Sequence, residues 1–296
     1  MTNYVTVKLK LEQFQILKKK YKNFIIPNTV NNIFLTIKKP QLRITCYNNG
    51  TCLFQGKLEY IQQILSLDLD NQFHINIGEA KEINSETNIG SDEVGMGDVF
   101  GPIVVCSVLV TEQQIPFLRD IGIKDSKKIL DNKIKKIFSI VQDKFVYSVK
   151  ILKPCEFNIW IKKYNMKHIQ ALLHNQAILE LINKTKDTRN VVLDQFVNSK
   201  KYFQYLQNEE QIYRKIQFET RAESKYASVA LASVIARAVF LQEMNKLKEQ
   251  IGYELLLGAG FKVDEQIYKI YQKHKELVFF QKIAKCNFRN VKKYFS

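Results

Sequence analysis

Two adjacent acids, Asp92 and Glu93, stand in a glycine-rich segment that could carry chemistry. The segment reads GSDEVGMGD over residues 90–98. Side chains along a strand alternate between faces, so adjacent acids converge on one ion only where the strand ends or twists. Glycines beside them let a ligand approach the backbone closely. A charged surface turn has a similar composition, so the rest of the chain must decide between the two interpretations.

Two further acids occupy positions that suit a functional site. Asp194 ends the apolar run 191–193, and the C-terminal edge of a buried strand is where open sheets carry chemistry. Glu223 lies just before the longest helical stretch. Taken alone, Asp194 could equally cap a helix. Glu223 could be a first-turn acid that complements a helix dipole.

Acids gathered from distant positions suit divalent metal chemistry. Magnesium prefers oxygen ligands at about 2.0–2.1 Å and keeps waters and phosphate in its shell. Two such ions about 3.5–4 Å apart can activate an attacking water and stabilise the leaving oxygen of a phosphodiester. The glycines Gly95, Gly97 and Gly101 do not form the dinucleotide-binding fingerprint, because their spacing is too long and a strand follows rather than a helix.

The composition indicates a folded protein with a polyanionic partner. The chain has 296 residues, with 45 basic against 29 acidic side chains and a net charge of +16. Such an excess favours nucleic acid, although a lysine-rich surface could serve solubility alone. The five cysteines form no C-x-x-C pair, so we expect reduced thiols in a cytoplasmic protein. No apolar stretch is long enough for a membrane span.

The patterning predicts two domains, 1–84 and 85–296, joined by a polar linker at about 68–87. The alternative is a long loop within one domain. Residues 1–84 alternate like strands, with helical spacing at 11–21 and 58–67 and a hairpin turn at 48–50. This α+β unit has no clustered acids, which favours a binding module.

The second domain predicts a mixed sheet covered by helices. We expect strands at 103–110, 145–152, 191–193 and 212–218, and helices at 166–182 and 226–250.

Five motifs together resemble bacterial ribonuclease HIII, of the ribonuclease HII/HIII family. They follow in the family's order and spacing, and the resemblance runs over most of the chain: GSDEVGMGDVFGPIVV, IKDSKK, LLHNQA, LDQF and AESKYASVALASVIAR. The resemblance implies an α/β fold with an RNase H-like mixed sheet flanked by helices. It also implies an N-terminal domain similar to half of a TATA-box-binding protein, which would bind substrate.

The resemblance further implies hydrolysis of the RNA strand of RNA–DNA hybrids, supported by Mg²⁺ or Mn²⁺ and leaving 3′-hydroxyl and 5′-phosphate ends. By similarity, Asp92, Glu93 and Asp194 bind metal, and Glu223 completes the catalytic cluster. The family's substrate contacts match Gly95, Met96, Gly97, Ser126 and Lys127, although Ser126 could instead belong to a helix cap. A monomer without a small-molecule cofactor is expected.

Some positions depart from the family pattern, and two other functions stay open. Phe261-Lys262 replaces a usual Pro-His, and Asn287 and Val291 replace a usual His and Thr. These changes put rate and pH dependence in doubt but leave the four acids intact. The alternatives are incision at single ribonucleotides in DNA, as in ribonuclease HII, and a catalytically silent hybrid-binding protein.

Overall fold

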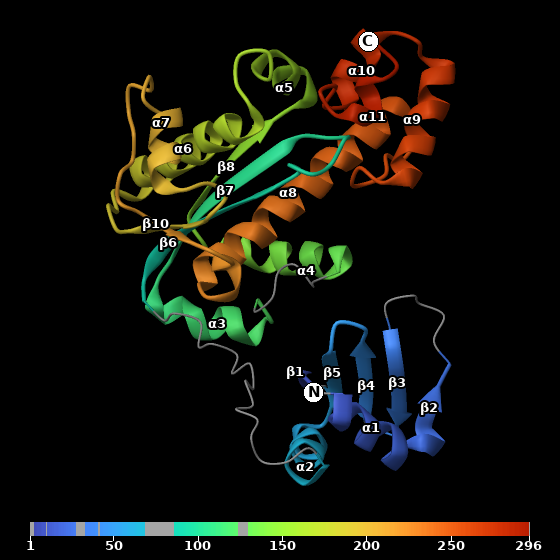
Figure 1. The fold of residues 1–296 in the computed structure, drawn as a ribbon. Helices are drawn as coiled ribbons and strands as arrows, with labels where there is room; N and C mark the ends of the chain where they lie inside the picture. Colours follow the sequence, from blue (N-terminus) through green and yellow to red (C-terminus); the bar gives the residue numbers. More distant parts are fainter. Residues whose placement is uncertain are drawn as a thin grey trace. The chain divides into compact units, whose positions relative to one another are not determined.

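The chain divides into two compact units, Met1–Lys81 and Glu82–Ser296, and each is described by itself (Figure 1). The computed structural model describes residues 3–9, 11–27, 33–40, 42–68, 86–123 and 130–295. The linker expected at about 68–87 falls mostly outside these ranges.

The described residues of the first unit form a five-stranded sheet and two α-helices, and every strand pair among them is antiparallel. The strand order is β1-β5-β4-β3-β2. The elements are β1 (Asn3–Lys8), α1 (Leu11–Lys20), β2 (Ile25–Ile26), β3 (Ile33–Lys39), β4 (Leu42–Tyr47), β5 (Thr51–Gly56) and α2 (Leu58–Asp68). Alternation along the strands brings Ile37, Ile44 and Phe54 into one core with Leu17 of α1 and Ile61 of α2.

The hairpin between β4 and β5 corrects one expectation about the cysteines. Cys46 and Cys52 lie directly opposite each other on the two strands, with their Cα atoms 4.1 Å apart. Their sulfur atoms form a disulfide, so the prediction of reduced thiols is wrong for this pair. The sequence offered no C-x-x-C signal, because the two residues meet only through the turn at 48–50. Cys106, Cys155 and Cys286 are free thiols.

The second unit contains a five-stranded mixed sheet in the order β10-β9-β6-β7-β8. The central strand β6 pairs antiparallel with β7 and parallel with β9. Strand β8 is antiparallel to β7, and β10 is parallel to β9. The strands are β6 (Asn88–Val94), β7 (Ile103–Val110), β8 (Tyr147–Leu152), β9 (Val191–Asp194) and β10 (Ile216–Glu219). This confirms the predicted mixed sheet.

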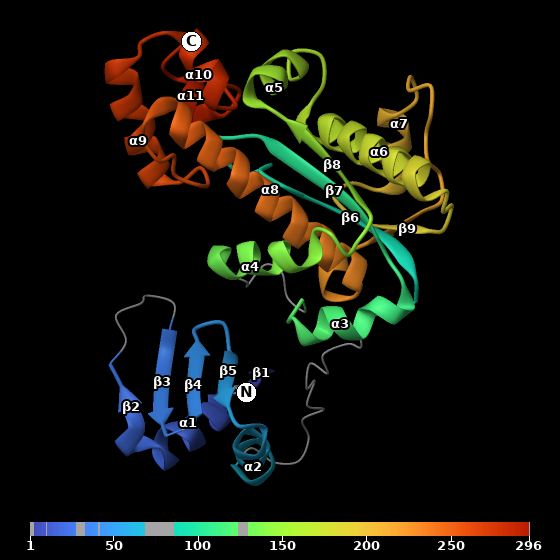
Figure 2. The same ribbon diagram turned by 180° about the vertical axis from the view of Figure 1, so that it is seen from behind.

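Both faces of the sheet are buried, which explains the continuous apolar run of β7. On one face, Ile103 and Val105 pack with residues of α6 (Met166–Thr185). On the other face, Val104 and Cys106 pack with residues of α8 (Ala227–Ile251). Figures 1 and 2 show α6 and α8 covering opposite faces. By length and composition α8 could cross a membrane, but 72% of its most apolar window is buried inside the protein.

Shorter helices surround this sandwich. Figure 2 shows the C-terminal helices gathered at one end of α8. The shorter helices are α3 (Ile115–Asp120), α4 (Asp131–Val141), α5 (Pro154–Trp160) and α7 (Ser199–Tyr205), and, in the C-terminal part, α9 (Phe261–Lys273), α10 (Leu277–Ile283) and α11 (Arg289–Lys292).

Strand β10 is shorter than the predicted strand at 212–218. It begins at Ile216, and the chain a few residues earlier bonds to a side chain of α6. The Asn175 amide donates to the Gln211 carbonyl at 2.8 Å, and its oxygen accepts from the Tyr213 backbone at 3.1 Å. Asn175 therefore serves packing and hydrogen bonding, as a buried helical asparagine is expected to do.

Candidate active site

Asp92 and Asp194 come from neighbouring parallel strands at the centre of the sheet. Strands β6 and β9 pair up to Ser91 and Leu193, and the two aspartates are the next residues along each strand. Residues level in a parallel pair share a face, so both carboxylates are expected on the α8 face. Their contacts agree, because Asp92 accepts a hydrogen bond from Ser233 of α8. Asp194 accepts one from the Ala222 backbone, just before α8, at 2.9 Å.

Glu93 faces the opposite side of the sheet from Asp92. It contacts Gln170 and His174 of α6, as strand alternation requires. The Gln170 amide nitrogen lies 2.6 Å from Glu93 Oε1, and His174 Nε2 lies 3.0 Å from Glu93 Oε2. The two adjacent acids therefore lie on opposite faces of the strand, and the charge of Glu93 still acts on Asp92.

The negative charges of Glu93 and Asp194 repel the negative charge of an ionised Asp92. Asp92 is only 4% exposed. Burial raises the pKa of Asp92 well above its usual value, and the negative charges of Glu93 and then Asp194 raise it further. The hydrogen bonds from Ser233 and from the Glu93 backbone act in the other direction. A buried carboxylate beside two like charges is unfavourable unless a positive charge offsets them.

Glu93 is held in its charged form by its neighbours. Burial alone would raise the pKa of Glu93, but the hydrogen bond and charge of His174 hold it below its usual value. Gln170 and Lys167 act in the same direction. Glu93 is therefore an anion at neutral pH, next to the buried Asp92.

Glu223 lies in a tight turn between β10 and α8. The turn is the 3-10 segment Ala222–Ser224, and Glu223 is 7% exposed. Arg221 begins it with a φ of 54°, the left-handed region that non-glycine residues rarely adopt. Because the Ala222 backbone N–H binds Asp194, this turn fixes Glu223 next to the aspartate. The acid is thus part of a short turn rather than of the long helix itself.

The glycine segment after β6 forms a loop with an open surface. Gly95 has a φ of 97°, and an added Cβ would lie 2.2 Å from the Pro102 carbonyl oxygen, so only glycine fits there. Met96 packs partly buried against the cluster that contains Ile103. Gly97 is exposed, and a Cβ there would meet nothing within 4 Å. Its backbone is accessible to a ligand.

Residues from the C-terminal part of the chain hold this loop. The Gly258 backbone donates to Asp98 Oδ1 at 2.6 Å. Lys285 Nζ donates to the Gly101 carbonyl at 2.6 Å, and the side chain is fully buried. Burial lowers the pKa of Lys285 to about 7, although Asp98 partly offsets this effect. Nothing in the local sequence of Lys285 indicates this contact, because the two residues are far apart in the chain.

Several expected contacts are placed and two are not. The charges of Glu93 and Asp194 both act on Asp92, and the turn that carries Glu223 is hydrogen-bonded to Asp194. Ser126 and Lys127 lie outside the described residues. Neither His174 nor Gln170 is among the site residues predicted from the sequence. Their spacing of four residues on a buried helical face was the available signal, since it places both on one side of the helix.

The donor types fit a hard divalent cation. All the acids offer carboxylate oxygens, which Mg²⁺ and Mn²⁺ accept, and a cation would offset the repulsion around Asp92. Within the described ranges, no three His, Cys, Asp or Glu side chains are arranged as a ready metal site. Each carboxylate oxygen of Glu93 makes one hydrogen bond to a side chain of α6. A carboxylate oxygen has two lone pairs. One lone pair on each oxygen therefore remains.

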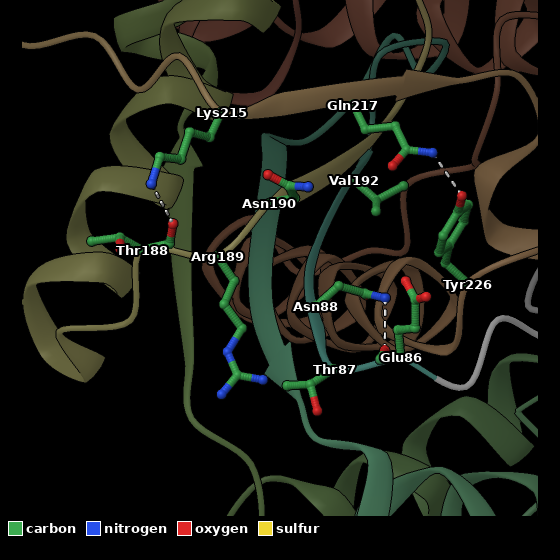
Figure 3. Close-up of a pocket in the computed structure, with 10 residues that line it drawn as sticks. All are labelled: Glu86, Thr87, Asn88, Thr188, Arg189, Asn190, Val192, Lys215, Gln217 and Tyr226. Carbon is green, nitrogen blue, oxygen red and sulfur yellow. Dashed lines mark hydrogen bonds between the residues drawn. The ribbon is translucent and has the colours of Figure 1, made fainter.

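A separate cavity of about 410 Å³ lies at the other end of the same strands (Figure 3). It is lined by Asn88 at the start of β6, by Asn190 before β9 and by Lys215 before β10. Gln217 and Tyr226, which are hydrogen-bonded at 2.8 Å, form another part of its wall. None of the predicted site residues lines this cavity.

Comparison with known families and proteins agrees with the motifs. The ribonuclease HII family model matches residues 89–291, and a domain of unknown function (DUF3378) matches residues 4–59. A ribonuclease HIII of Phytoplasma mali is 44% identical over 298 residues, covering 100% of this chain and 99% of that protein. A ribonuclease HIII of Streptococcus thermophilus is 33% identical, covering 98% and 97%.

Solved structures show the same architecture. The crystal structure of Bst-RNase HIII in complex with Mn²⁺ matches with a TM-score of 0.70 at 31% identity, covering 99% of this chain and 98% of that one. The ribonuclease H2 of Pyrococcus horikoshii matches with a TM-score of 0.60 at 26% identity, covering 70% and 96%. The chain therefore belongs to the ribonuclease HIII group of the ribonuclease HII/HIII family, whose members are endoribonucleases.

Proposed function

We propose that this protein cuts the RNA strand of RNA–DNA hybrids endonucleolytically by divalent-metal catalysis. In this reaction a water oxygen attacks phosphorus and the bond from phosphorus to the 3′ oxygen breaks. The 3′ oxygen takes a proton and leaves as a hydroxyl, while the phosphate stays on the 5′ end of the downstream fragment. The observation that carries the proposal is the set of mutually repelling carboxylates Asp92, Glu93 and Asp194 at the ends of β6 and β9.

Asp92, Glu93 and Asp194 would hold the metal, with Glu223 completing the acidic cluster. When bound, Mg²⁺ or Mn²⁺ would activate the attacking water and stabilise charge on the leaving oxygen. The Mn²⁺ complex of Bst-RNase HIII, which matches almost the whole chain, supports this assignment. The protein's own contribution is to hold charged oxygens on two rigid strands and to keep Glu93 ionised.

The glycine loop at residues 95–97 is proposed to recognise the ribose of the RNA strand. Gly95, Met96 and Gly97 would place backbone groups against the minor groove, where the 2′-hydroxyl distinguishes RNA from DNA. The exposed backbone at Gly97 supports this role, since no side chain obstructs it. Ser126 and Lys127 are proposed to contact the backbone near the cleaved phosphate.

The first unit is proposed to bind the hybrid, and the protein to act as a cytoplasmic monomer. The net charge of the whole chain is +16, which favours contacts between the protein and the phosphates of a nucleic acid. Such contacts release counterions, so binding should weaken steeply as salt is raised.

A comparison of two substrates tests the specificity. We expect efficient cutting of a continuous RNA–DNA hybrid and much weaker cutting of a DNA duplex that contains one ribonucleotide. Mapping the products with enzymes that need a 3′-hydroxyl or a 5′-phosphate checks the ends. Preferential cutting at the single ribonucleotide would favour the ribonuclease HII-like alternative. Tight hybrid binding without any product would favour a silent binding protein.

A further inference from the structure

Both oxygens of the Glu93 carboxylate are hydrogen-bonded by side chains of one helix, α6. Gln170 Nε2 donates to Oε1 at 2.6 Å, and His174 Nε2 lies 3.0 Å from Oε2. The two residues are four apart on α6, so one rigid helical face supplies both contacts. A carboxylate with both oxygens fixed cannot rotate about its terminal bond without losing a hydrogen bond.

The orientation of the Gln170 amide is set by a cation. Lys167 Nζ lies 3.2 Å from Gln170 Oε1. An ammonium group only donates, so the amide oxygen faces Lys167 and the amide nitrogen faces Glu93. The first turn of α6 therefore determines which end of the amide Glu93 meets.

The His174 ring is fixed from three sides. It is fully buried, and its Nδ1 lies 2.8 Å from the Ser91 hydroxyl. Phe196 stacks on the ring, with centroids 5.6 Å apart and planes at 21°. Since the ionised Glu93 only accepts hydrogen bonds, Nε2 carries the proton that points at the carboxylate. Ser91 lies two residues before Glu93 on β6, so both side chains lie on the same face of the strand. The two ring nitrogens of His174 therefore contact two residues of that one face.

We propose that His174 and Gln170 are positioning residues, which aim the Glu93 carboxylate for the divalent cation and for hydrolysis. This inference rests on the proposed function of the acidic cluster. Partners that orient a metal-binding carboxylate typically contribute about 10–100-fold in metal affinity or activity. A purely structural role predicts instead that any loss follows the loss of folding stability.

Four variants separate these roles. In His174→Gln, the side-chain amide nitrogen can replace Nε2 and still donate to Glu93. In His174→Asn, the shorter side chain can reach only the Ser91 side. Gln170→Met keeps length and volume but removes the donor to Oε1. Asn175→Ala is the matched control, because Asn175 is buried on the same helix and, among the described residues, its side chain bonds to the chain at 211 and 213 rather than to Glu93.

Each variant is checked for folding by circular dichroism and thermal melting. The readouts are the Mn²⁺ dissociation constant by calorimetry without substrate, and kcat and KM on an RNA–DNA hybrid. We expect His174→Asn and Gln170→Met to weaken Mn²⁺ binding and lower kcat by about 10–100-fold each, with KM nearly unchanged. We expect His174→Gln to stay within a few-fold of the parent protein. Asn175→Ala should lower the melting temperature without changing Mn²⁺ affinity.

Equal losses in His174→Gln and His174→Asn would overturn the proposal, as would a loss of Mn²⁺ affinity in Asn175→Ala that matches theirs. If His174 variants do not fold, Gln170→Met alone decides, and parental Mn²⁺ affinity in that variant contradicts the proposal. A parent protein that binds Mn²⁺ but does not cut hybrid would contradict the proposed function. The order of Mn²⁺ affinities among the variants would still test the positioning role.

Discussion

Asp92 carries a carboxylate that is 4% exposed and feels the negative charges of Glu93 and Asp194. The native protein keeps a proton on this group at pH values where the unfolded chain has already lost it. Its contribution to stability is therefore present at low pH and is lost as the pH rises through the raised pKa. At neutral pH, without a cation, this acid should destabilise the fold.

Asp92→Asn should therefore be more stable and almost inactive. We expect a melting temperature a few degrees higher in EDTA at pH 8, because about 1 kcal/mol corresponds to about 2–4 °C in a protein of this size. Cutting of hybrid with Mg²⁺ should fall by more than about 100-fold, beyond the loss typical of an orienting partner. Hybrid binding should persist. The exposed Asp120→Asn serves as control and should change neither quantity. Robust cutting by Asp92→Asn would contradict the metal role.

Some residues of the candidate site could be predicted from the sequence and others could not. Asp92, Glu93 and Asp194 could be singled out because acids next to glycines or at a strand end are rare in a core. Lys285 and Ser233 could not, because their roles arise from contacts between segments far apart in the chain. The same limit applies to His174, whose chemistry depends on facing Glu93 across the sheet.

At the level of elements, the site depends on how closely α8 approaches β6. A Cβ on Gly90 would lie 2.2 Å from the backbone of Ser228 and Val229. The close approach brings Ser233 of α8 to Asp92. The periodicity predicted α6 and α8 nearly to their ends. It could not predict that the chain at Gln211 and Tyr213 bonds to Asn175, because this contact joins segments that are far apart in the sequence.

Gly90→Ala should therefore destabilise the second unit strongly. We expect the free energy of unfolding to fall by about 3 kcal/mol, the upper end for overpacking a core, because backbone rather than a flexible side chain must move. Urea unfolding followed by fluorescence of Trp160, the single tryptophan, measures this unit. Gly260→Ala is the matched control, since a Cβ there meets nothing within 4 Å. An unfolding midpoint equal to the parent would show that α8 can shift without cost.

The contact between Lys285 and the glycine loop predicts a pH dependence. With a pKa of about 7 in the folded protein and an ordinary value of 10.5, Lys285 binds fewer protons when folded between these limits. Its contribution to stability should therefore rise as the pH increases from about 7 towards 10.5. Between pH 7 and pH 9, the unfolding free energy of the parent relative to Lys285→Met should grow by about 2 kcal/mol. Taking the difference between the two proteins cancels the contribution of the other titrating groups to the pH dependence. A difference that is flat or shrinks would contradict a neutral buried amine.

At the scale of the whole molecule, the sequence indicated two domains with different roles, one for substrate binding and one for catalysis. The first unit has its own core of Leu17, Ile37, Ile44, Phe54 and Ile61, and its described residues contain no acidic cluster that could hold a metal. The second unit holds the four acids. Composition could suggest this division because strand-like alternation gives way to a polar stretch before the glycine-rich segment. It could not reveal the disulfide of the first unit, which depends on strand register.

Deleting residues 1–84 should weaken hybrid binding much more than it slows chemistry. We expect KM to rise by about 100-fold, because a tethered binding module raises the local concentration of substrate. The rate at saturating hybrid should change only a few-fold, since all four acids remain. Steady-state kinetics at two salt concentrations measures both quantities. An unchanged KM in the truncated protein would rule out the binding role of the first unit.

The central claim is that the acidic cluster performs metal-dependent cleavage of RNA in hybrids. The most direct test is to incubate the protein with a labelled RNA–DNA hybrid, with Mg²⁺, with Mn²⁺ and with EDTA, beside single-stranded and double-stranded RNA. We predict cutting of the hybrid alone, and only when a divalent cation is present. Cutting in EDTA, equal cutting of all RNAs, or tight hybrid binding without cutting under either metal would contradict the account.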